Sequence, residues 1–413
     1  MTDTLVPTVP VTADRPAHRD PNVLRWLGAY TSSMLGDSIY YIALSWAAVQ
    51  AGTPAEAGVV MSVSALPRAV LMLGGGVLAD RLGPRRVVIG SDAVRCAAVL
   101  AVAALLFVTS PGLWPLTLLA LVFGTVDAVF MPAVGALPAR ITGKPQLARV
   151  QGMRGLAIRF ASVVGAPLGG LGVAAGGAAA AFALAGLLIA VSVPLLYSVR
   201  VRDLPADEKQ GGREATPWRD LRSGLAYVRH HRVLAPLMVA IALGDFGFVG
   251  PLNVGLTLLA DQRGWGASGM GSVLAGFGAA SLLLTVRGRL PRAGLVAACA
   301  VLAGSVAIGA LGYAPNLAAA VVTALLIGLL AGLSGAMCGA LLQTQADPAR
   351  LGRVTAVSSL VSLGLAPLSM PFAAAAIGVW GLGPVFVVSA VVCGLGGVVA
   401  LCVPALRRAE LPR

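Results

Sequence analysis

Long apolar stretches alternate with short polar ones along this chain. The apolar stretches cover residues 25–50, 58–79, 87–109, 114–139, 148–174 and 178–199, and then 233–260, 267–286, 294–313, 317–342, 353–376 and 383–404. A helix of about 20 residues crosses a hydrocarbon core of about 30 Å. Such segments must be helical in lipid because open strands would leave backbone groups unpaired. The pattern predicts an all-α integral membrane protein with twelve transmembrane helices.

The composition supports this class. Of the 413 residues, 57% are hydrophobic and 11% are charged, whereas soluble domains carry roughly 25% charged residues. The lipid bilayer is therefore an expected partner. The five cysteines lie inside apolar stretches without metal-ligand spacing, so no metal site is expected. The first 22 residues contain no apolar core, and we expect a polar tail there rather than a signal peptide.

The positive charge is concentrated at the termini and in alternate loops. The net charge is +13. Basic residues cluster at both termini and in every second loop: Arg15, Arg19, Arg25, Arg81, Arg85, Arg86, Arg140, Lys144, Arg149, Arg287, Arg289, Arg292, Arg350, Arg353, Arg407 and Arg408. The opposite loops hold one basic residue, Arg263. Basic loops stay cytoplasmic, so both termini are predicted to be cytoplasmic, and the charge needs no nucleic-acid partner to explain it.

A polar segment divides the chain into two halves. We expect a tail over 1–22, a six-helix bundle over 23–199, a cytoplasmic linker over 200–232, a second six-helix bundle over 233–404 and a tail over 405–413. Within the linker, Thr216 and Pro217 suit the N-cap and first position of a helix. The apolar residues that follow at helical spacing are Trp218, Leu221, Leu225 and Val228. They predict an amphipathic helix on the membrane surface, although a simple tether is equally compatible.

The two halves contain matching tripeptides in equivalent spans. LGD occurs at 35–37 and 243–245, GAL at 135–137 and 339–341, and APL at 166–168 and 366–368. RLGPR at 81–85 has a shorter counterpart, RLPR, at 289–292. The matches keep their order, which predicts a parallel duplication. Two such repeats related by an axis along the membrane normal form a transporter architecture with its binding site between them near the midplane.

The loop between the second and third spans carries a motif. Its defined positions are Gly76, Asp80, Arg81, Gly83, Arg85 and Arg86. The motif resembles the signature loop of the major facilitator superfamily in composition and in position. This resemblance implies that Asp80 forms a bond that latches the cytoplasmic side shut in the outward-facing state. Asp80 needs such a cationic partner because the helix dipole disfavours an anion at a C-terminus.

Further stretches of the sequence resemble one subgroup of this superfamily. SSMLGDSIYYIALSW (32–46), SDAVR (91–95), MPAVGALPARI (131–141) and DPARLGRV (347–354) resemble the macrolide-efflux and enterobactin-exporter group of bacterial proton-driven exporters. The fourth span departs from the antiporter signature because it carries Asp127 and no arginine. The resemblance implies alternating-access export of a small molecule, proton antiport, a multi-pass location in the bacterial plasma membrane and a monomer.

Several spans contain ionisable residues. Asp37, Asp127, Asp245, Arg68 and Arg159 lie 10–13 residues from the nearest loop charge, which is about 15–20 Å along a helix. Each costs about 2.5–3.5 kcal/mol at the bilayer centre and so indicates a function by default. We expect these residues to serve proton coupling, with Asp37 as the proton carrier and Asp127 as the alternative. The opposing interpretation is a static pair between Asp37 and Arg68 or Arg159.

A further acid–base pair lies in the third span. Asp92 and Arg95 are one helical turn apart and can pair directly, which favours a structural role over one in transport.

The aromatic residues near the buried carboxylates are candidates for a substrate cavity. They are Tyr40, Tyr41, Phe246 and Phe248, which could line the cavity or simply pack. We expect the exported molecule to be hydrophobic or amphipathic, since few polar groups are available for a sugar. The alternative is an importer or uniporter of the same fold. The sequence has no His-x3-His pair, Gly-x-Ser-x-Gly motif or phosphate loop, so neither an enzyme nor a cofactor is expected.

Overall fold

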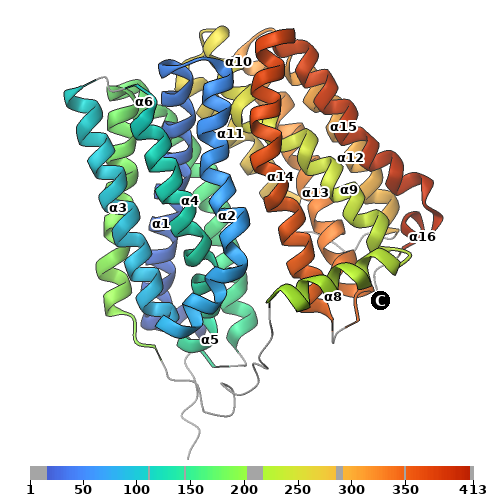
Figure 1. Cartoon of the computed structure of the whole chain (residues 1–413), viewed down its shortest axis with the longest axis horizontal. Coiled ribbons are helices and arrows are strands. Elements are labelled where there is room, and N and C mark those ends of the chain that lie inside the picture. Colours follow the sequence, from blue (N-terminus) through green and yellow to red (C-terminus); the bar gives the residue numbers. More distant parts are fainter. Residues whose placement is uncertain are drawn as a thin grey trace, which may run out of the picture.

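Two helical bundles stand side by side in the computed structural model (Figure 1). The model describes residues 16–109, 112–143, 146–201, 217–284, 292–347 and 350–409. Within these ranges the regular elements are helices and no strand occurs. The short helix η1 (Ala17–Arg19) and the helix α8 (Pro217–His230) lie at one end of the molecule. We call this end the basic end, because Arg81 and Arg85 at the turn from α2 to α3, Arg140 in α5 and Arg353 at the start of α14 lie there.

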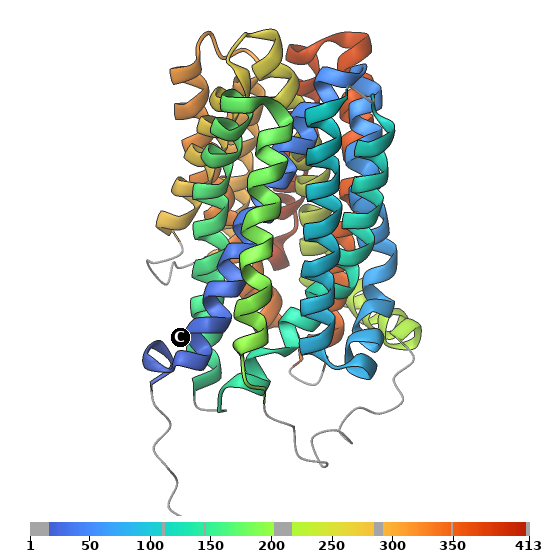
Figure 2. The same cartoon turned by 90° about the vertical axis from the view of Figure 1, so that its left-hand side faces the viewer.

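The first half contains α1 (Pro21–Ala51), α2 (Pro54–Leu82), α3 (Pro84–Val108), α4 (Trp114–Ala136), the single turn α5 (Pro138–Ile141) and α6 (Leu147–Ser198). Figure 2 views this half from its outer side. Gly176 and Gly177 break α6, and Gly177 has φ +70°. A residue with a β-carbon rarely adopts this backbone conformation. The break therefore lets α6 reverse direction and cross the membrane twice.

The second half contains α9 (Leu234–Gly250), η3 (Pro251–Gly255), α10 (Leu256–Gln262), α11 (Gly266–Leu284), α12 (Ala293–Leu311), α13 (Leu317–Gln345), α14 (Leu351–Trp380), α15 (Leu382–Cys402) and the single turn α16 (Pro404–Arg407). The segments α9, η3 and α10 follow one another without interruption and form one crossing. The middle segment η3 is a π-helical turn that begins at Pro251. Proline lacks the backbone donor that an α-helix needs there, which accounts for the local change.

The described residues confirm the prediction of twelve crossings. Eight helical stretches are long and apolar enough to cross a membrane by length and composition, and one of them is α6, which crosses twice. The remaining crossings are α1, α2 and α11. Both α1 and α2 carry charged residues in their middle, such as Asp37 and Arg68. Proline within the crossings, such as Pro67 in α2, is tolerated in membranes because neighbouring helices satisfy the freed backbone groups.

Equivalent helices pack in equivalent ways in the two halves. The pairs α1–α6, α2–α4 and α3–α6 in the first half correspond to α9–α15, α11–α13 and α12–α15 in the second. The main contacts between halves, α2 with α14 and α6 with α11, are also related by the repeat. The duplication predicted from the tripeptides is therefore present in the helix packing.

The halves contact each other near the end opposite the basic end. Gly58 of α2 faces Ala374 and Pro371 of α14, and a β-carbon on Gly58 would overlap the Ala374 side chain. The repeat-related contact of α6 with α11 is equally close. A β-carbon on Gly271 would lie 2.6 Å from the Ala166 carbonyl oxygen. Small residues let helices in lipid approach this closely.

Hydrogen bonds between polar side chains also join the two halves at the end opposite the basic end. Ser45 of α1 and Thr257 of α10 share a hydrogen bond of 2.5 Å between their hydroxyl oxygens. Gln50 Nε2 donates to Asp261 Oδ1 at 2.6 Å. The first helix of the first half is thus tied directly to the first crossing of the second half.

The helix α8 lies across the basic end below the second half (Figure 1). Leu221 and Val228 are buried and cluster with Val354 and Val357 of α14, whereas Leu225 is exposed. The observed helix covers the part of the linker where the sequence predicts an amphipathic helix. The division of the chain at residues 199/200 and 232/233 stays a prediction.

Candidate functional site

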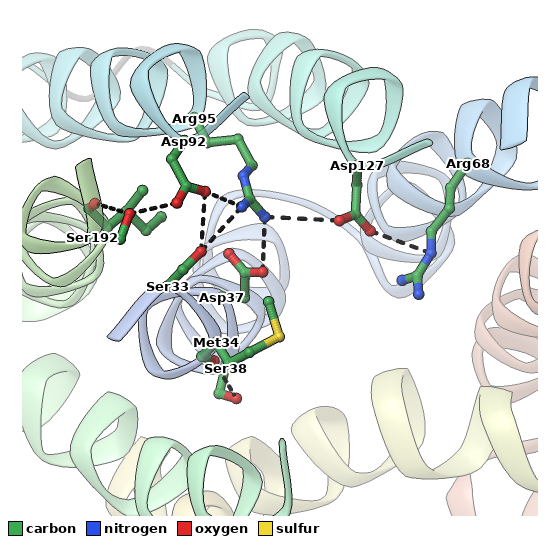
Figure 3. Close-up of polar contacts among 10 residues, drawn as sticks. Ser33, Met34, Asp37, Ser38, Arg68, Asp92, Arg95, Asp127 and Ser192 are labelled. Atoms are coloured by element: carbon green, nitrogen blue, oxygen red, sulfur yellow. Dashed lines mark hydrogen bonds and ion pairs between the residues drawn. The ribbon is translucent and has the colours of Figure 1, made fainter. Parts of the chain in front are cut away.

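Arg95 is the centre of a buried group of charges in the first half. Its Nη1 donates to Asp37 Oδ2 at 2.8 Å and lies 3.7 Å from Asp127 Oδ1, while its Nη2 pairs with Asp92. Arg68 Nε lies 3.2 Å from the other oxygen of Asp127. These five residues come from α1, α2, α3 and α4, and Figure 3 shows their side chains converging. We refer to them as the charge cluster.

The carboxylate of Asp92 is held by several donors. Ser33 Oγ donates to Asp92 Oδ1 at 3.1 Å, and Ser192 Oγ donates to Asp92 Oδ2. Arg95 Nη2 donates to the same Asp92 Oδ1 and to Ser33 Oγ. The Asp92 side chain is 1% exposed. A buried carboxylate with this many partners is held in one orientation.

Aromatic rings cover the guanidinium of Arg95. Its Cζ lies 3.9 Å from the ring centroid of Phe130 and 5.3 Å from that of Phe123, both on α4. Cations are attracted to ring faces at such distances, more so when both are desolvated. The Arg95 side chain is 0% exposed, so the carboxylates and these rings replace its water.

Asp37 is held less completely than Asp92. Its Oδ1 is buried and has no hydrogen-bond partner, whereas its Oδ2 accepts from Arg95. The Asp37 side chain is 11% exposed, against 3% for Asp127. Asp37 is therefore the more exposed of these two carboxylates, and it has one ion-pair partner where Asp127 has two.

The pairing differs from the static pair considered from the sequence. Asp37 pairs with Arg95 of α3, whereas Arg68 pairs with Asp127. Arg159 lies elsewhere, on the wall of a cavity. Sequence spacing brings Asp92 and Arg95 together as expected, but Arg95 also contacts two carboxylates from other helices. The Asp92–Arg95 pair is thus part of the cluster rather than separate from it.

Three contributors were missed in the sequence. Ser33 is one turn before Asp37, and Phe130 is three residues after Asp127, so each shares a helix face with a carboxylate. That spacing was an available signal. Ser192 has no comparable signal, because it reaches Asp92 from the second crossing of α6, 100 residues away.

A cavity of about 570 Å³ lies in the second half. Its wall extends from Ile308 and Phe277 to Leu237, Gly294 and Leu406 near the basic end. We call it the second-half cavity. Most of its lining is apolar, and its charged lining residues within the described chain are Asp245 and Arg159. Pockets for drug-sized ligands are typically of this size and polarity.

The four aromatic candidates do not form one wall. Phe248 lines the second-half cavity, where its ring lies 5.6 Å from that of Phe277. Tyr40 is fully buried and stacks on Phe123 at 3.8 Å between ring centroids. Tyr41 packs against the same Phe123. Of the two alternatives for these aromatic residues, packing describes Tyr40 and Tyr41, whose side chains both contact Phe123 within the first half.

Phe246 also lies outside the second-half cavity. It faces Phe372 of α14, at 6.2 Å between ring centroids, and lines a smaller hollow with it. Since Phe246 and Phe248 are two residues apart on α9, they occupy different faces of the helix.

The signature loop is described in part. Gly83 has φ +86° and precedes α3, a conformation that glycine adopts without strain. Arg85 Nη2 donates to the Tyr197 carbonyl oxygen at 2.6 Å, and Arg81 and Arg86 are exposed. Gly76 and Asp80 lie on α2, but the Asp80 side chain is outside the described part of the molecule, so the expected latch stays a prediction.

Comparison with known proteins agrees with this architecture. The family model of the Major Facilitator Superfamily matches residues 26–362. The chain is similar to the multidrug efflux pump Tap of Mycobacterium tuberculosis, with 25% identity over 414 residues and 96% of each chain covered. It is also similar to the enterobactin exporter EntS of Escherichia coli, with 27% identity over 329 residues, 75% of this chain and 77% of EntS.

Solved structures share the fold. The nucleoside transporter NupG superposes with a TM-score of 0.69 at 13% identity, covering 95% of this chain and all of NupG (100%). The human organic anion transporter MFSD10 superposes with a TM-score of 0.60 at 17% identity, covering 92% of this chain and 100% of MFSD10.

Proposed function

The chain belongs to the Major Facilitator Superfamily, and from this premise we propose that it exports a hydrophobic or amphipathic small molecule in exchange for protons. The similarity to a multidrug efflux pump and to an enterobactin exporter supports export as the direction. An importer or uniporter of the same fold is the alternative. The observation that carries the proton-coupled mechanism is the composition of the charge cluster.

The charge cluster contains one more carboxylate than it has guanidinium groups. Asp37, Asp92 and Asp127 face Arg68 and Arg95. With all groups ionised, the cluster carries a net charge of −1 in a site where Arg95 is fully buried. An uncompensated buried charge is costly. Uptake of one proton balances the cluster, and release restores the surplus, which is the property that a proton carrier needs.

Asp37 is the carboxylate best suited to take up that proton. Asp92 already accepts hydrogen bonds from Ser33, Ser192 and Arg95. Asp127 lies between two arginines. Asp37 has a single cationic partner and an oxygen without a hydrogen bond. Asp127 remains the alternative carrier because its Oδ1 also lacks a hydrogen bond.

Protonation of Asp37 can affect the contact between the halves. Neutral Asp37 holds Arg95 less strongly, so Nη1 is free to approach Asp127 Oδ1, now 3.7 Å away. Ser45, two helical turns further along α1, bonds Thr257 and the Asn253 carbonyl oxygen of the second half. A shift of α1 would change these contacts. The helix α1 therefore connects the proton site at Asp37 with the contact between the halves at Ser45 and Thr257.

We place both termini in the cytoplasm of a bacterial cell, with the protein in the plasma membrane as a monomer. The basic end supplies the positive charge that retains loops on the cytoplasmic side. Contacts between the halves lie near the opposite end. In this orientation the second-half cavity extends toward the cytoplasm, as suits uptake of a molecule for export.

The test is transport in proteoliposomes with a fluorescent amphipathic dye, rhodamine B. Asp37→Asn removes the titratable group and keeps the size of the side chain. We expect it to abolish dye movement driven by a pH gradient and to retain exchange of dye across the membrane without a gradient. Asp20→Asn is the matched control, because Asn caps the start of α1 as well as Asp does.

Full gradient-driven transport by Asp37→Asn would refute the proton role. The direction of the gradient that drives dye accumulation separates the proposed exporter from an importer. If the unmodified protein transports the dye at the same rate with and without a pH gradient, it is a uniporter.

A further inference from the structure

The second-half cavity contains two opposite charges that are not paired with each other. Asp245 is on α9 and Arg159 is on α6. The ion pairs found among the described residues involve neither of them. Asp245 Oδ2 is buried and has no hydrogen-bond partner. The serines 358 and 362 lie on the same wall. The cavity therefore offers one anion and one cation to a ligand.

The two charges lie at a similar depth. Arg159 is twelve residues from the start of α6, and Asp245 is eleven residues from the start of α9. Both helices start at the basic end, so these counts correspond to about 18 and 16 Å along the helices. Arg159 is the lining residue that comes from the first half, whereas the rest of the described lining belongs to the second half. A ligand that touches both charges would bridge the halves.

The electrostatics of this cavity discriminate among ligands by charge. A lipophilic monocation would pair with Asp245 but would share the cavity with Arg159, and a monoanion would meet Asp245. A neutral molecule would displace water and leave both charges without an ionic partner, which is costly in an apolar site. A molecule that carries both charges can satisfy both residues.

We propose that the second-half cavity binds an amphoteric amphiphile, whose cationic group pairs with Asp245 and whose anionic group pairs with Arg159. This inference rests on the proposed function for its direction of transport, and it specifies the substrate class. The apolar wall, including Phe248 and Phe277, holds the hydrophobic body of the ligand. The bridging ligand touches both halves at this depth, so binding draws the halves together on the cytoplasmic side.

The experiment compares rhodamine B, which carries a cationic ring system and a carboxylate, with its ethyl ester, which carries the cation alone. Binding to the purified full chain in lipid nanodiscs is measured by fluorescence anisotropy at neutral pH. We expect the unmodified protein to bind rhodamine B about tenfold or more tightly than the ester, as one charge-assisted contact requires. Asp245→Asn should weaken the binding of both dyes.

Arg159→Gln decides between the proposal and simple packing. This substitution should lower the affinity for rhodamine B by about tenfold. The affinity for the ester should stay the same or rise. Arg263→Gln, at an exposed position of the opposite end, is the control and should leave both affinities as they are. Equal affinity for both dyes in the unmodified protein, or an equal loss of both in Arg159→Gln, would overturn the proposal.

This measurement is independent of proton coupling, because it is made at equilibrium without a membrane gradient. Selective binding of the zwitterion together with absent gradient-driven transport would contradict the proposed function and support the substrate class. Gradient-driven export of both dyes with no preference in binding would support the proposed function and contradict the substrate class.

Discussion

Removal of Arg95 should be the most destabilising single change in the charge cluster. Arg95→Gln leaves Asp37, Asp92 and Asp127 with Arg68 as the remaining cation. The Arg95 side chain is 0% exposed and Asp92 is 1% exposed, so Asp92 loses its charge partner where water cannot replace it. Breaking a buried pair on one side costs about 3–5 kcal/mol. We expect a loss of unfolding free energy in this range.

The same substitution at Arg68 provides the comparison. The Arg68 side chain is 25% exposed, and its partner Asp127 still has Arg95 nearby. Partial exposure screens the interaction, so Arg68→Gln should cost about 1 kcal/mol. Adding Asp37→Asn to Arg95→Gln removes one of the repelling carboxylates. This double substitution should recover about 1–2 kcal/mol, which is a typical coupling between residues in contact.

Unfolding can be followed through a natural thiol. Cys393 is buried in the second half. With the other four cysteines replaced by serine, it becomes accessible to a thiol-reactive fluorophore when the protein unfolds in mixed detergent micelles. The unfolding midpoints of the single and double variants give the free-energy differences. Equal losses for Arg95→Gln and Arg68→Gln, or no recovery on adding Asp37→Asn, would show that the cluster is not organised around Arg95.

Three further outcomes are expected. Gly124→Ala should lower the unfolding midpoint by an amount that corresponds to about 1–3 kcal/mol, because its β-carbon would overlap the carbonyl group of Ser64 between α4 and α2; an unchanged midpoint would contradict this packing. Cysteines at Gln50 and Asp261, which share a 2.6 Å hydrogen bond, should stop dye transport when joined by a short bifunctional reagent, and continued transport would mean that this contact need not open. Asp80→Asn should leave the size-exclusion profile unchanged yet strongly reduce turnover, and undiminished turnover would refute the latch expected from the signature loop.

Much of the fold could be predicted because each crossing is a local property of the sequence. A stretch such as 87–109 must form a helix in lipid whatever its neighbours do, and α3 covers Pro84–Val108. The ends of other elements were less predictable. The first helix begins at Pro21 rather than near residue 25, because Asp20 caps it by accepting a hydrogen bond from the Asn22 backbone. The π-helical turn at Pro251 has no periodic signal in the sequence.

The sequence predicted which charged residues take part in the candidate site, but it did not predict which of them pair with each other. The spacing of Asp92 and Arg95 places them on one helix face, and the structure brings them together. The partner of Asp37 could not be derived in this way, because α1 and α3 meet at a rotation that depends on packing throughout the bundle. The two tyrosines illustrate the same limit, since Tyr40 stacks on Phe123 in the core instead of facing the second-half cavity.

The sequence by itself therefore determined the twelve crossings, the duplication and the side on which positive charge collects, since hydropathy and charge act locally against a fixed membrane. The tertiary structure decided which charges compensate one another. Arg95 meets carboxylates from α1, α3 and α4, while Arg159 and Asp245 remain without an ion-pair partner at the wall of the second-half cavity. These pairings depend on how each helix is rotated and how closely it approaches its neighbours, and only the packed bundle sets those quantities.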